Sequence, residues 1–182
     1  GIYKILSSEV DSHPILKEIE IAKIAVKDLS KKRDIELLNN LLTDDPFELI
    51  NDPTIDVIVE VMGGVDLAKD IILRSLKSGK SVVTANKAVI ARYGEEIYKT
   101  AAKDGVYILS EAAVCGGIPI IEPLKRSLKS NTIKKMVGII NGTTNFILSK
   151  MANEKADYKE TLKLAQIGRA HVWTPVTDVS RM

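Results

Sequence analysis

The sequence has 182 residues, 45% of them hydrophobic and 27% charged, as expected for a globular protein of one domain or slightly more. A net charge of +2 argues against nucleic-acid and acidic-membrane partners, and no apolar run approaches the roughly 18 residues that a membrane span needs. The single cysteine, Cys115, excludes an internal disulfide and, with no signal-peptide pattern, favours a cytoplasmic location.

The first two thirds of the chain alternate between helical and strand-like patterns. Helices are predicted over residues 2–8, in a short segment from Pro46, over residues 66–78 with Gly79 after the last turn, and over residues 94–104 with Gly105 after the last turn. Strands are predicted over residues 18–26, 55–61, 81–84 and 106–109. Strands and helices joined by short links predict a parallel sheet that is covered by helices on both faces.

Polar residues follow two of these strands where each strand ends. Gly63 comes after the strand 55–61, and Thr84, Asn86 and Lys87 lie at the end of the strand 81–84. Ligands of open α/β sheets bind just outside the carboxyl ends of the strands. A glycine there lets the backbone approach a cofactor, although it can also be a simple turn residue. From its position alone, Lys87 could equally be a solvated lysine of a loop.

A second unit is predicted after a small, glycine-rich segment at residues 110–119. A helix over residues 120–128 and a strand over residues 132–140 come first. The turn 141–145 then leads into a helix at 146–151, with Thr143 or Thr144 as its cap, and a last helix starts at Asp157 and Glu160. These patterns predict a first domain over residues 1–115 and the start of an α+β domain over residues 116–166.

Residues 167–182 differ from the rest of the chain. The run IGRAHVWTPVTDVSRM drops the helical pattern and is similar to the translation of a DNA sequencing adapter. We interpret it as a cloning or assembly scar and give His171 and Trp173 no functional weight. A natural polar tail is the alternative.

Four motifs occur in one order along the chain: VEVMGG (59–64), VVTANKA (82–88), EAAVCGGIPII (111–121) and NGTTNFIL (141–148). Through them the chain resembles homoserine dehydrogenase over residues 1–166. The resemblance implies a cytoplasmic NAD- or NADP-dependent oxidoreductase of threonine and methionine biosynthesis that interconverts L-homoserine and L-aspartate 4-semialdehyde. It also implies a homodimer or homotetramer.

The resemblance implies a fold as well. Residues 1–115 would form a Rossmann-like, doubly wound parallel sheet whose first strand and glycine fingerprint lie before Gly1, and a substrate and dimerisation domain would follow. The second catalytic lysine of the family would lie beyond the last native helix. We therefore expect the 182-residue chain by itself to be inactive.

Roles for single residues follow from the same motifs. The resemblance implies that Lys87 is catalytic, that Gly63, Thr84, Asn86 and Lys87 bind the cofactor, that Gly142 and Thr143 bind substrate, and that Glu111, Val114, Gly116 and Ile118 hold sodium or potassium. One carboxylate with backbone carbonyls suits such a hard cation, although without the resemblance the segment would be a helix-entry loop. Cys115 has no histidine nearby and is interpreted as a small packing residue.

Two alternative functions and the choice between NAD and NADP stay open. The chain could be another NAD(P)-dependent enzyme, such as an aspartate dehydrogenase or a dihydrodipicolinate reductase, although the NGTTN turn before a helix argues against both. It could also be a non-catalytic nucleotide-binding module. In the charged cluster 27–33, an acid would favour a ribose hydroxyl and basic groups a 2′-phosphate, and since both signs are present NAD and NADP are not distinguished.

Overall fold

The computed structural model describes residues 2–8, 14–33, 41–139 and 141–171. They belong to two compact units, Gly1–Ala113 and Val114–Met182, which are described separately. No helix in this described part of the chain has both the length and the apolar character that crossing a membrane requires.

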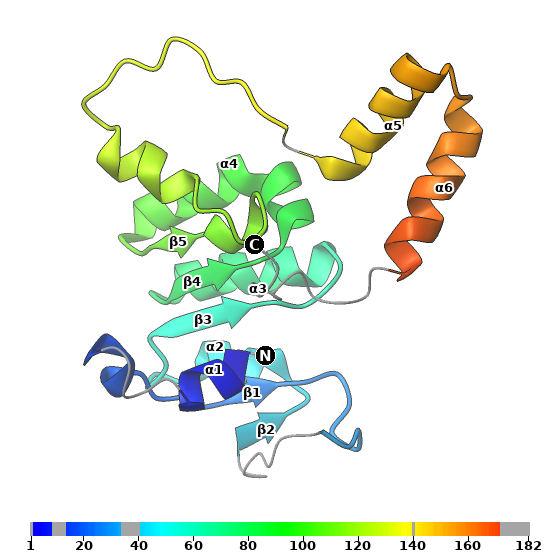
Figure 1. The fold of residues 1–182 in the computed structure, drawn as a ribbon. Coiled ribbons are helices and arrows are strands. Elements are labelled where there is room, and N and C mark those ends of the chain that lie inside the picture. The colour runs from blue at the N-terminus through cyan, green and yellow to red at the C-terminus, as the bar shows by residue number, and fades with distance from the viewer. Residues whose placement is uncertain (1, 9–13, 34–40, 140, 172–182) are drawn as a thin grey trace. The chain divides into compact units, whose positions relative to one another are not determined.

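The described residues of the first unit contain five short parallel strands, which are β1 (Ile24–Ala25), β2 (Leu42–Thr43), β3 (Val57–Glu60), β4 (Ser81–Thr84) and β5 (Ile108–Leu109). They follow one another in the order β2, β1, β3, β4, β5 (Figure 1). Strand β1 pairs with β2, and β4 pairs with both β3 and β5, but among the described residues no ladder joins β1 to β3. The doubly wound order has its first strand at that position, so the interruption agrees with the predicted Rossmann-like sheet that lacks this strand.

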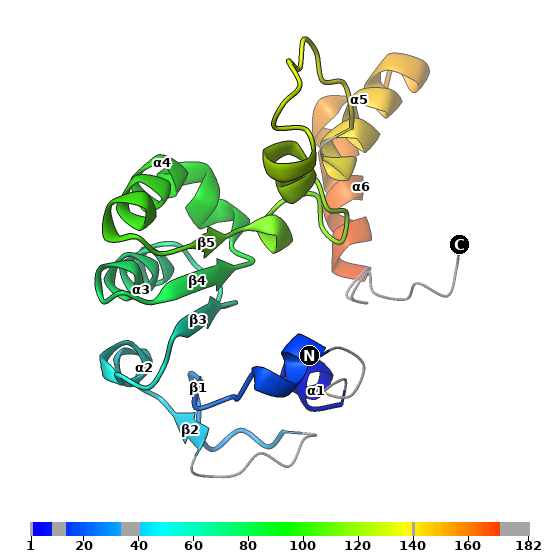
Figure 2. The same cartoon turned by 90° about the vertical axis from the view of Figure 1, so that its left-hand side faces the viewer.

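Helices cover one face of this sheet. Helices α2 (Pro46–Asn51), α3 (Asp66–Lys77) and α4 (Lys87–Asp104) lie together on one side of the strands (Figure 2). Successive residues of a strand point to opposite faces. The core is formed by inward strand residues and by apolar residues of these helices, including Ile58, Val82, Ile108, Ile72, Leu76, Val89 and Ile97.

The opposite face of β3 is uncovered. Val57, Val59 and Val61 are 48%, 46% and 58% exposed. The prediction that helices cover both faces is therefore wrong at β3. The helix α1 (Ile2–Ser8), which was predicted at these residues, is short and itself exposes Ile2 and Ile5.

Helix ends in the first unit follow local signals. The carboxylate of Asp45 accepts a hydrogen bond from the amide of Phe47 (2.8 Å), and Pro46 occupies the first turn of α2. Gly79 after α3 has φ +77° and Gly105 after α4 has φ +71°, which confirms both predicted helix ends. The predicted start of α4 at Gly94 is wrong, because Asn86 caps the helix and Gly94 lies in its interior.

One predicted strand forms only in part, and another does not form in the described residues. Within residues 18–26, Glu18 ends a 3-10 turn (Pro14–Glu18) and only Ile24–Ala25 pair, since β1 has a partner on one edge alone. Residues 132–139 form no regular structure, and Met136, Val137 and Ile139 are 70–85% exposed. An alternating pattern needs a neighbouring strand to satisfy its backbone groups, and the described part of the second unit offers none.

The second unit is helical where it is described. A π-type turn (Pro123–Ser127) lies within the predicted helix 120–128, and α5 (Gly142–Glu154) and α6 (Tyr158–His171) form a hairpin (Figure 1). The cap of α5 is Asn141, whose side chain accepts from the amide of Thr144 (2.9 Å), so the prediction of a threonine cap is wrong. Asp157 accepts from the amides of Lys159 and Glu160, which confirms the predicted start of α6.

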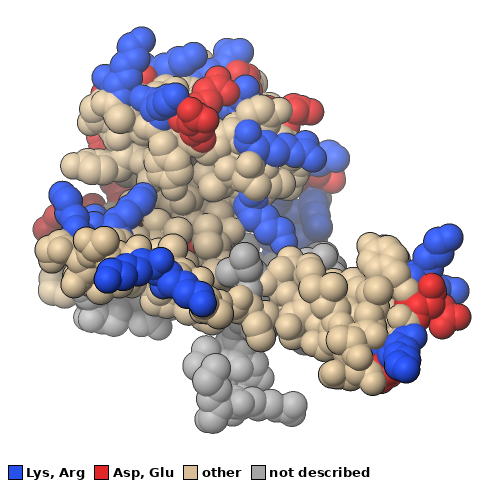
Figure 3. Space-filling view, turned by 90° about the horizontal axis from the view of Figure 1, so that it is seen from above, with Lys and Arg blue, Asp and Glu red and all other residues tan. Residues whose placement is uncertain are grey.

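Helix α6 extends to His171, so the prediction that the helical pattern ends before Ile167 is wrong for residues 167–171. Residues 172–182, which include Trp173, lie outside the described residues. The hairpin shows a broad uncharged surface with charged side chains collected at its closed end (Figure 3). Its exposed apolar residues include Phe146, Leu148, Tyr158 and Leu164.

Candidate functional site

The loops that follow β3 and β4 meet at the carboxyl edge of the sheet. The two strands pair in parallel, with Glu60 opposite Thr84 in register. The turn at Met62–Gly64 therefore lies beside the segment that enters α4. This arrangement brings the predicted residues Gly63, Asn86 and Lys87 together with Thr84 at one edge of the first unit.

A buried carboxylate joins the ends of the two strands. Glu60 is only 3% exposed. Its Oε2 accepts from the hydroxyl of Thr84 (2.6 Å), and its Oε1 accepts from the amide of Met62 (2.9 Å). The amide of Asn86 donates in turn to the Thr84 oxygen (3.0 Å). One side chain thus holds both the turn after β3 and the start of the loop after β4.

The side chain of Asn86 also connects the turn after β3 to the start of α4. Its Oδ1 accepts from the amide of Val89 (3.2 Å), which caps α4. Its Nδ2 donates to the carbonyl of Gly64 at 2.8 Å and lies 3.4 Å from that of Met62. The side chains of Thr84 and Asn86 are therefore engaged within the protein, and their direct contact with a cofactor stays a prediction.

Two of the predicted site residues, Lys87 and Gly63, are exposed to solvent. Lys87 is the first residue of α4 and is exposed. Gly63 is exposed too, and a Cβ added there would meet no protein atom within 4 Å. The neighbouring Gly64 has φ +85°, a conformation that favours glycine. The turn therefore leaves open space above its backbone.

These groups fit the nicotinamide half of a dinucleotide. An exposed glycine turn lets a flat ring or a sugar come close to the backbone, and a lysine can donate to hydroxyl or carboxamide oxygens. The position at the carboxyl end of parallel strands is where α/β sheets bind such ligands. The chemistry of this edge thus suits the predicted cofactor.

Glu60 was not among the residues predicted from the sequence. A signal for it exists, because Glu60 shares the inward face of β3 with Ile58, and an acid at an inward strand position is rarely found without partners. The partners themselves lie 24 residues away at Thr84 and are not visible from local spacing.

The charged loop after β1 keeps both of its predicted features. The hydroxyl of Ser30 and the amide of Ser30 both donate to the carboxylate of Asp28. These two hydrogen bonds, the first more than the second, hold the pKa of the Asp28 carboxyl below its usual value. The guanidinium of Arg33 donates to the carbonyls of Asp28 and Lys31. An ionised acid and a guanidinium thus remain in one exposed loop, as each cofactor would need.

The remaining predicted residues are divided between the two units. Glu111 lies in a 3-10 turn (Glu111–Ala113) of the first unit, and the second unit contains Val114, Gly116, Ile118 and, in the first turn of α5, Gly142 and Thr143. No group of three or more His, Cys, Asp or Glu side chains in the described residues could hold a metal. The proposed cation ligands, being mostly carbonyls, stay a prediction.

Cys115 does not pack as predicted. It is exposed and has φ +55°.

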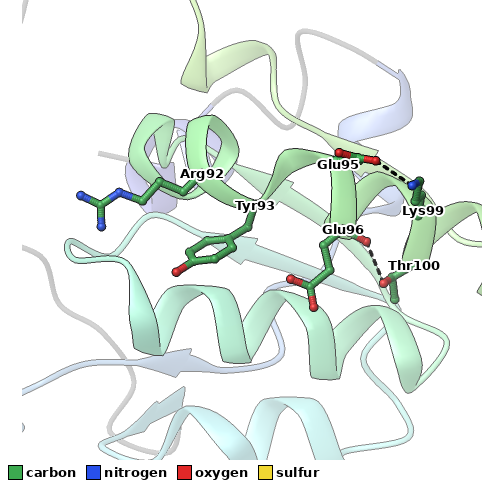
Figure 4. Close-up of a pocket in the computed structure, with 6 residues that line it drawn as sticks. All are labelled: Arg92, Tyr93, Glu95, Glu96, Lys99 and Thr100. Atoms are coloured by element: carbon green, nitrogen blue, oxygen red, sulfur yellow. Dashed lines mark hydrogen bonds and ion pairs between the residues drawn. The ribbon is translucent and has the colours of Figure 1, made fainter.

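A surface hollow of about 460 Å³ lies elsewhere, along α4 (Figure 4), and is lined by Arg92, Tyr93, Glu95, Glu96, Lys99 and Thr100. Both acids in its lining are paired, since Lys69 lies 2.9 Å from Glu96 and Lys99 lies 2.6 Å from Glu95. The hollow includes none of the predicted site residues, so we do not assign a ligand to it.

Comparisons with known proteins agree with the motifs. The family model described as the NAD-binding domain of homoserine dehydrogenase matches residues 2–111, and the model described as homoserine dehydrogenase matches residues 119–180. The chain is 51% identical over 180 residues to the homoserine dehydrogenase of Synechocystis, covering 98% of this chain and 41% of the relative. It therefore spans about two fifths of the length of that protein.

Solved structures show the same similarity. The homoserine dehydrogenase of S. aureus at pH 6.0 matches with a TM-score of 0.70 and 38% identity, over 98% of this chain and 44% of the other. A hyperthermophilic archaeal homoserine dehydrogenase in complex with NADPH matches with a TM-score of 0.58 and 28% identity, over 93% of this chain and 47% of the other. The motifs, the interrupted parallel sheet and these matches together place the chain in the homoserine dehydrogenase family.

Proposed function

We propose that the protein to which this sequence belongs is an NAD(P)-dependent oxidoreductase that interconverts L-homoserine and L-aspartate 4-semialdehyde, a step of threonine and methionine biosynthesis. The observation that supports this function is the meeting of the Gly63 turn and Lys87 at the carboxyl edge, in a chain of this family. The chain covers 41% of the Synechocystis relative, so the activity belongs to the complete enzyme.

Oxidation of a primary alcohol removes a hydride from carbon and a proton from oxygen. The nicotinamide ring, when bound, supplies the hydride acceptor. Lys87, at the start of α4, would hold the substrate oxygen by a hydrogen bond and take part in moving its proton. Gly63 would leave the ring room beside the backbone, and the Asn86 cap would hold Lys87 at this edge. In the reverse direction the same lysine would deliver the proton to the aldehyde oxygen.

The cofactor is NADP or NAD. The archaeal relative was solved with NADPH, which supports the phosphorylated form, and the loop with Arg33 offers a guanidinium for a 2′-phosphate. Asp28 in the same loop offers a carboxylate for a ribose hydroxyl. Both forms are therefore included in the proposal.

The finer assignments are part of the same proposal. Glu111 with carbonyls of Val114, Gly116 and Ile118 would bind sodium or potassium, and Gly142 with Thr143 would contact the substrate. The enzyme would be a cytoplasmic homodimer or homotetramer. Residues 1–115 would form the dinucleotide-binding domain, residues 116–166 would begin the substrate domain, and residues 167–182 would be a cloning or assembly scar.

The proposal is tested with a complete dehydrogenase chain that carries this sequence. Homoserine-dependent reduction of NAD or NADP is followed by absorbance. Lys87→Met should lower kcat by about 10²–10⁴-fold, since proton transfer and substrate positioning both depend on its amine. Lys77→Met is the matched control, because Lys77 is an exposed lysine at the end of α3 and should be replaceable. Absence of homoserine-dependent turnover, or full activity of the Lys87 variant, would contradict the proposal.

The cation assignment has its own test in the same enzyme. Glu111→Ala should weaken activation by sodium or potassium more than it changes dinucleotide affinity, because only the cation would lose a charged ligand. Titrating activity against both ions decides, and an unchanged ion dependence would leave residues 111–118 as a plain loop.

A further inference from the structure

We propose that Glu60 is a positioning residue of the dehydrogenase, which holds the Gly63 turn and Lys87 in the arrangement that binds the dinucleotide. This inference rests on the proposed function and adds to it a residue that touches neither cofactor nor substrate.

The carboxylate of Glu60 is buried and hydrogen-bonded to two different segments of the chain. At 3% exposed it is removed from water, which is costly for an acid unless hydrogen bonds replace the lost solvation. No ion pair found among the described residues includes Glu60. Its partners are the hydroxyl of Thr84, at the end of β4, and the amide of Met62, in the turn after β3. A buried acid without a basic partner is thus used as a two-sided acceptor.

The hydrogen bonds around Glu60 have a defined direction. The only proton of the Thr84 hydroxyl is donated to Glu60, so the Thr84 oxygen is left to accept from the amide of Asn86. The Asn86 side chain then caps α4 and donates to the carbonyl of Gly64. The contacts form a closed path from β3 to β4 and back to the glycine turn. Lys87 follows Asn86 directly, so its position depends on this path.

The chain contains a matched structural counterpart at the other end of β4. Lys80 is 5% exposed, and its Nζ donates to the carbonyls of Asp52 and Ile55 at 2.6 Å each. It is also a buried charged side chain that ties neighbouring loops together. It precedes β4, however, whereas Glu60 and Thr84 end the strands beside the predicted site. A comparison of the two separates positioning of the site from general stability.

The experiment compares Glu60→Gln, Thr84→Val and Lys80→Met in a complete dehydrogenase chain that carries this sequence. Dinucleotide affinity is measured by fluorescence titration with NADPH or NADH, whichever the unmodified enzyme binds more tightly. Glutamine keeps the size of the side chain but faces one of the two donors with an NH2 group, and valine removes the hydroxyl. Both variants should raise Kd about tenfold or more, since small displacements of a binding group are costly. Lys80→Met should lower Tm and leave Kd within about twofold.

Hydrogen exchange gives a second readout that does not depend on activity. In the Glu60→Gln enzyme the amides of Met62 and Asn86 should exchange faster, whereas Lys80→Met should leave them protected. If Glu60→Gln binds the dinucleotide as tightly as the unmodified enzyme, or if Lys80→Met weakens binding equally, the inference is overturned. An unmodified enzyme that neither binds a dinucleotide nor converts homoserine would instead remove the proposed function, and this inference with it.

Discussion

At the scale of single residues, buried charged groups act as anchors between loops that are distant in sequence. Lys80 donates to the carbonyls of Asp52 and Ile55, which follow α2 and precede β3. Three donors on one ammonium group suit a site where several carbonyls converge. At the other edge of the sheet, the two carboxylate oxygens of Glu60 accept hydrogen bonds from the amide of Met62 and the hydroxyl of Thr84. Each anchor places a loop that the adjacent secondary structure alone would leave unspecified.

Replacement of Lys80 by methionine should lower the free energy of unfolding by about 2 kcal/mol. The loss comes from two charge-assisted hydrogen bonds, partly offset because methionine is cheaper to bury. Urea denaturation of the complete protein measures the change. Lys77→Met, at an exposed lysine three residues earlier, should change stability by less than about 0.5 kcal/mol. Equal effects of the two substitutions would show that the bonds of Lys80 contribute nothing specific.

At the scale of secondary-structure elements, α4 shows how one residue type can have opposite roles. Gly94 lies in the interior of the helix, and a Cβ there would lie 3.8 Å from Cγ2 of Ile90, an ordinary contact. Gly105 follows the last turn with φ +71°, where a side chain is strained although no atom is near. Sequence alone marks both as possible helix breaks. Only the second of them ends the helix.

Substitution of these two glycines by alanine should therefore have opposite effects. Gly94→Ala should stabilise the protein by about 0.5–1 kcal/mol, because glycine in a helix interior costs that much relative to alanine. Gly105→Ala should destabilise it by roughly 1–2 kcal/mol, because of its left-handed backbone. Thermal unfolding of both variants measures the difference. A destabilising Gly94→Ala would mean that the helix is not continuous from Lys87 to Asp104.

At the scale of the whole molecule, the sheet of the first unit is incomplete within the described residues. Among these residues strand β3 pairs only with β4, and its outer face exposes Val57 and Val59. Unpaired strand edges and uncovered apolar faces promote association between chains. Each unmade buried hydrogen bond costs about 1–3 kcal/mol, which is large against a total stability of roughly 5–15 kcal/mol.

The 182-residue chain by itself should accordingly self-associate or lack fixed tertiary packing, and it should not turn over homoserine. Size-exclusion chromatography and binding of a hydrophobic dye measure the first property, and the absorbance assay measures the second. Val59→Lys places a charge on the exposed face and should reduce association, whereas Lys77→Met should not. A monomeric sample with a sharp two-state thermal transition would contradict this prediction.

The sequence by itself determined the family, the order of most elements and several of their ends. Glycines after α3 and α4 and the carboxylate of Asp157 act on amides or dihedral angles a few residues away, so they could be recognised locally. The strand patterns over residues 55–61 and 81–84 placed Gly63 and Lys87 after strand ends, where the structure has them. Signals of this kind depend on neighbouring residues only.

The tertiary structure alone decided which of these patterns formed and which side chains cooperate. Residues 132–139 alternate like a strand but have no partner in the described part of their unit, and β1 pairs over two residues on one edge. Glu60 finds its partner Thr84 24 residues away, and the side chain of Asn86 reaches the turn after β3. Strand pairing and buried hydrogen bonds need partners from distant segments, whose positions are set only when the chain folds.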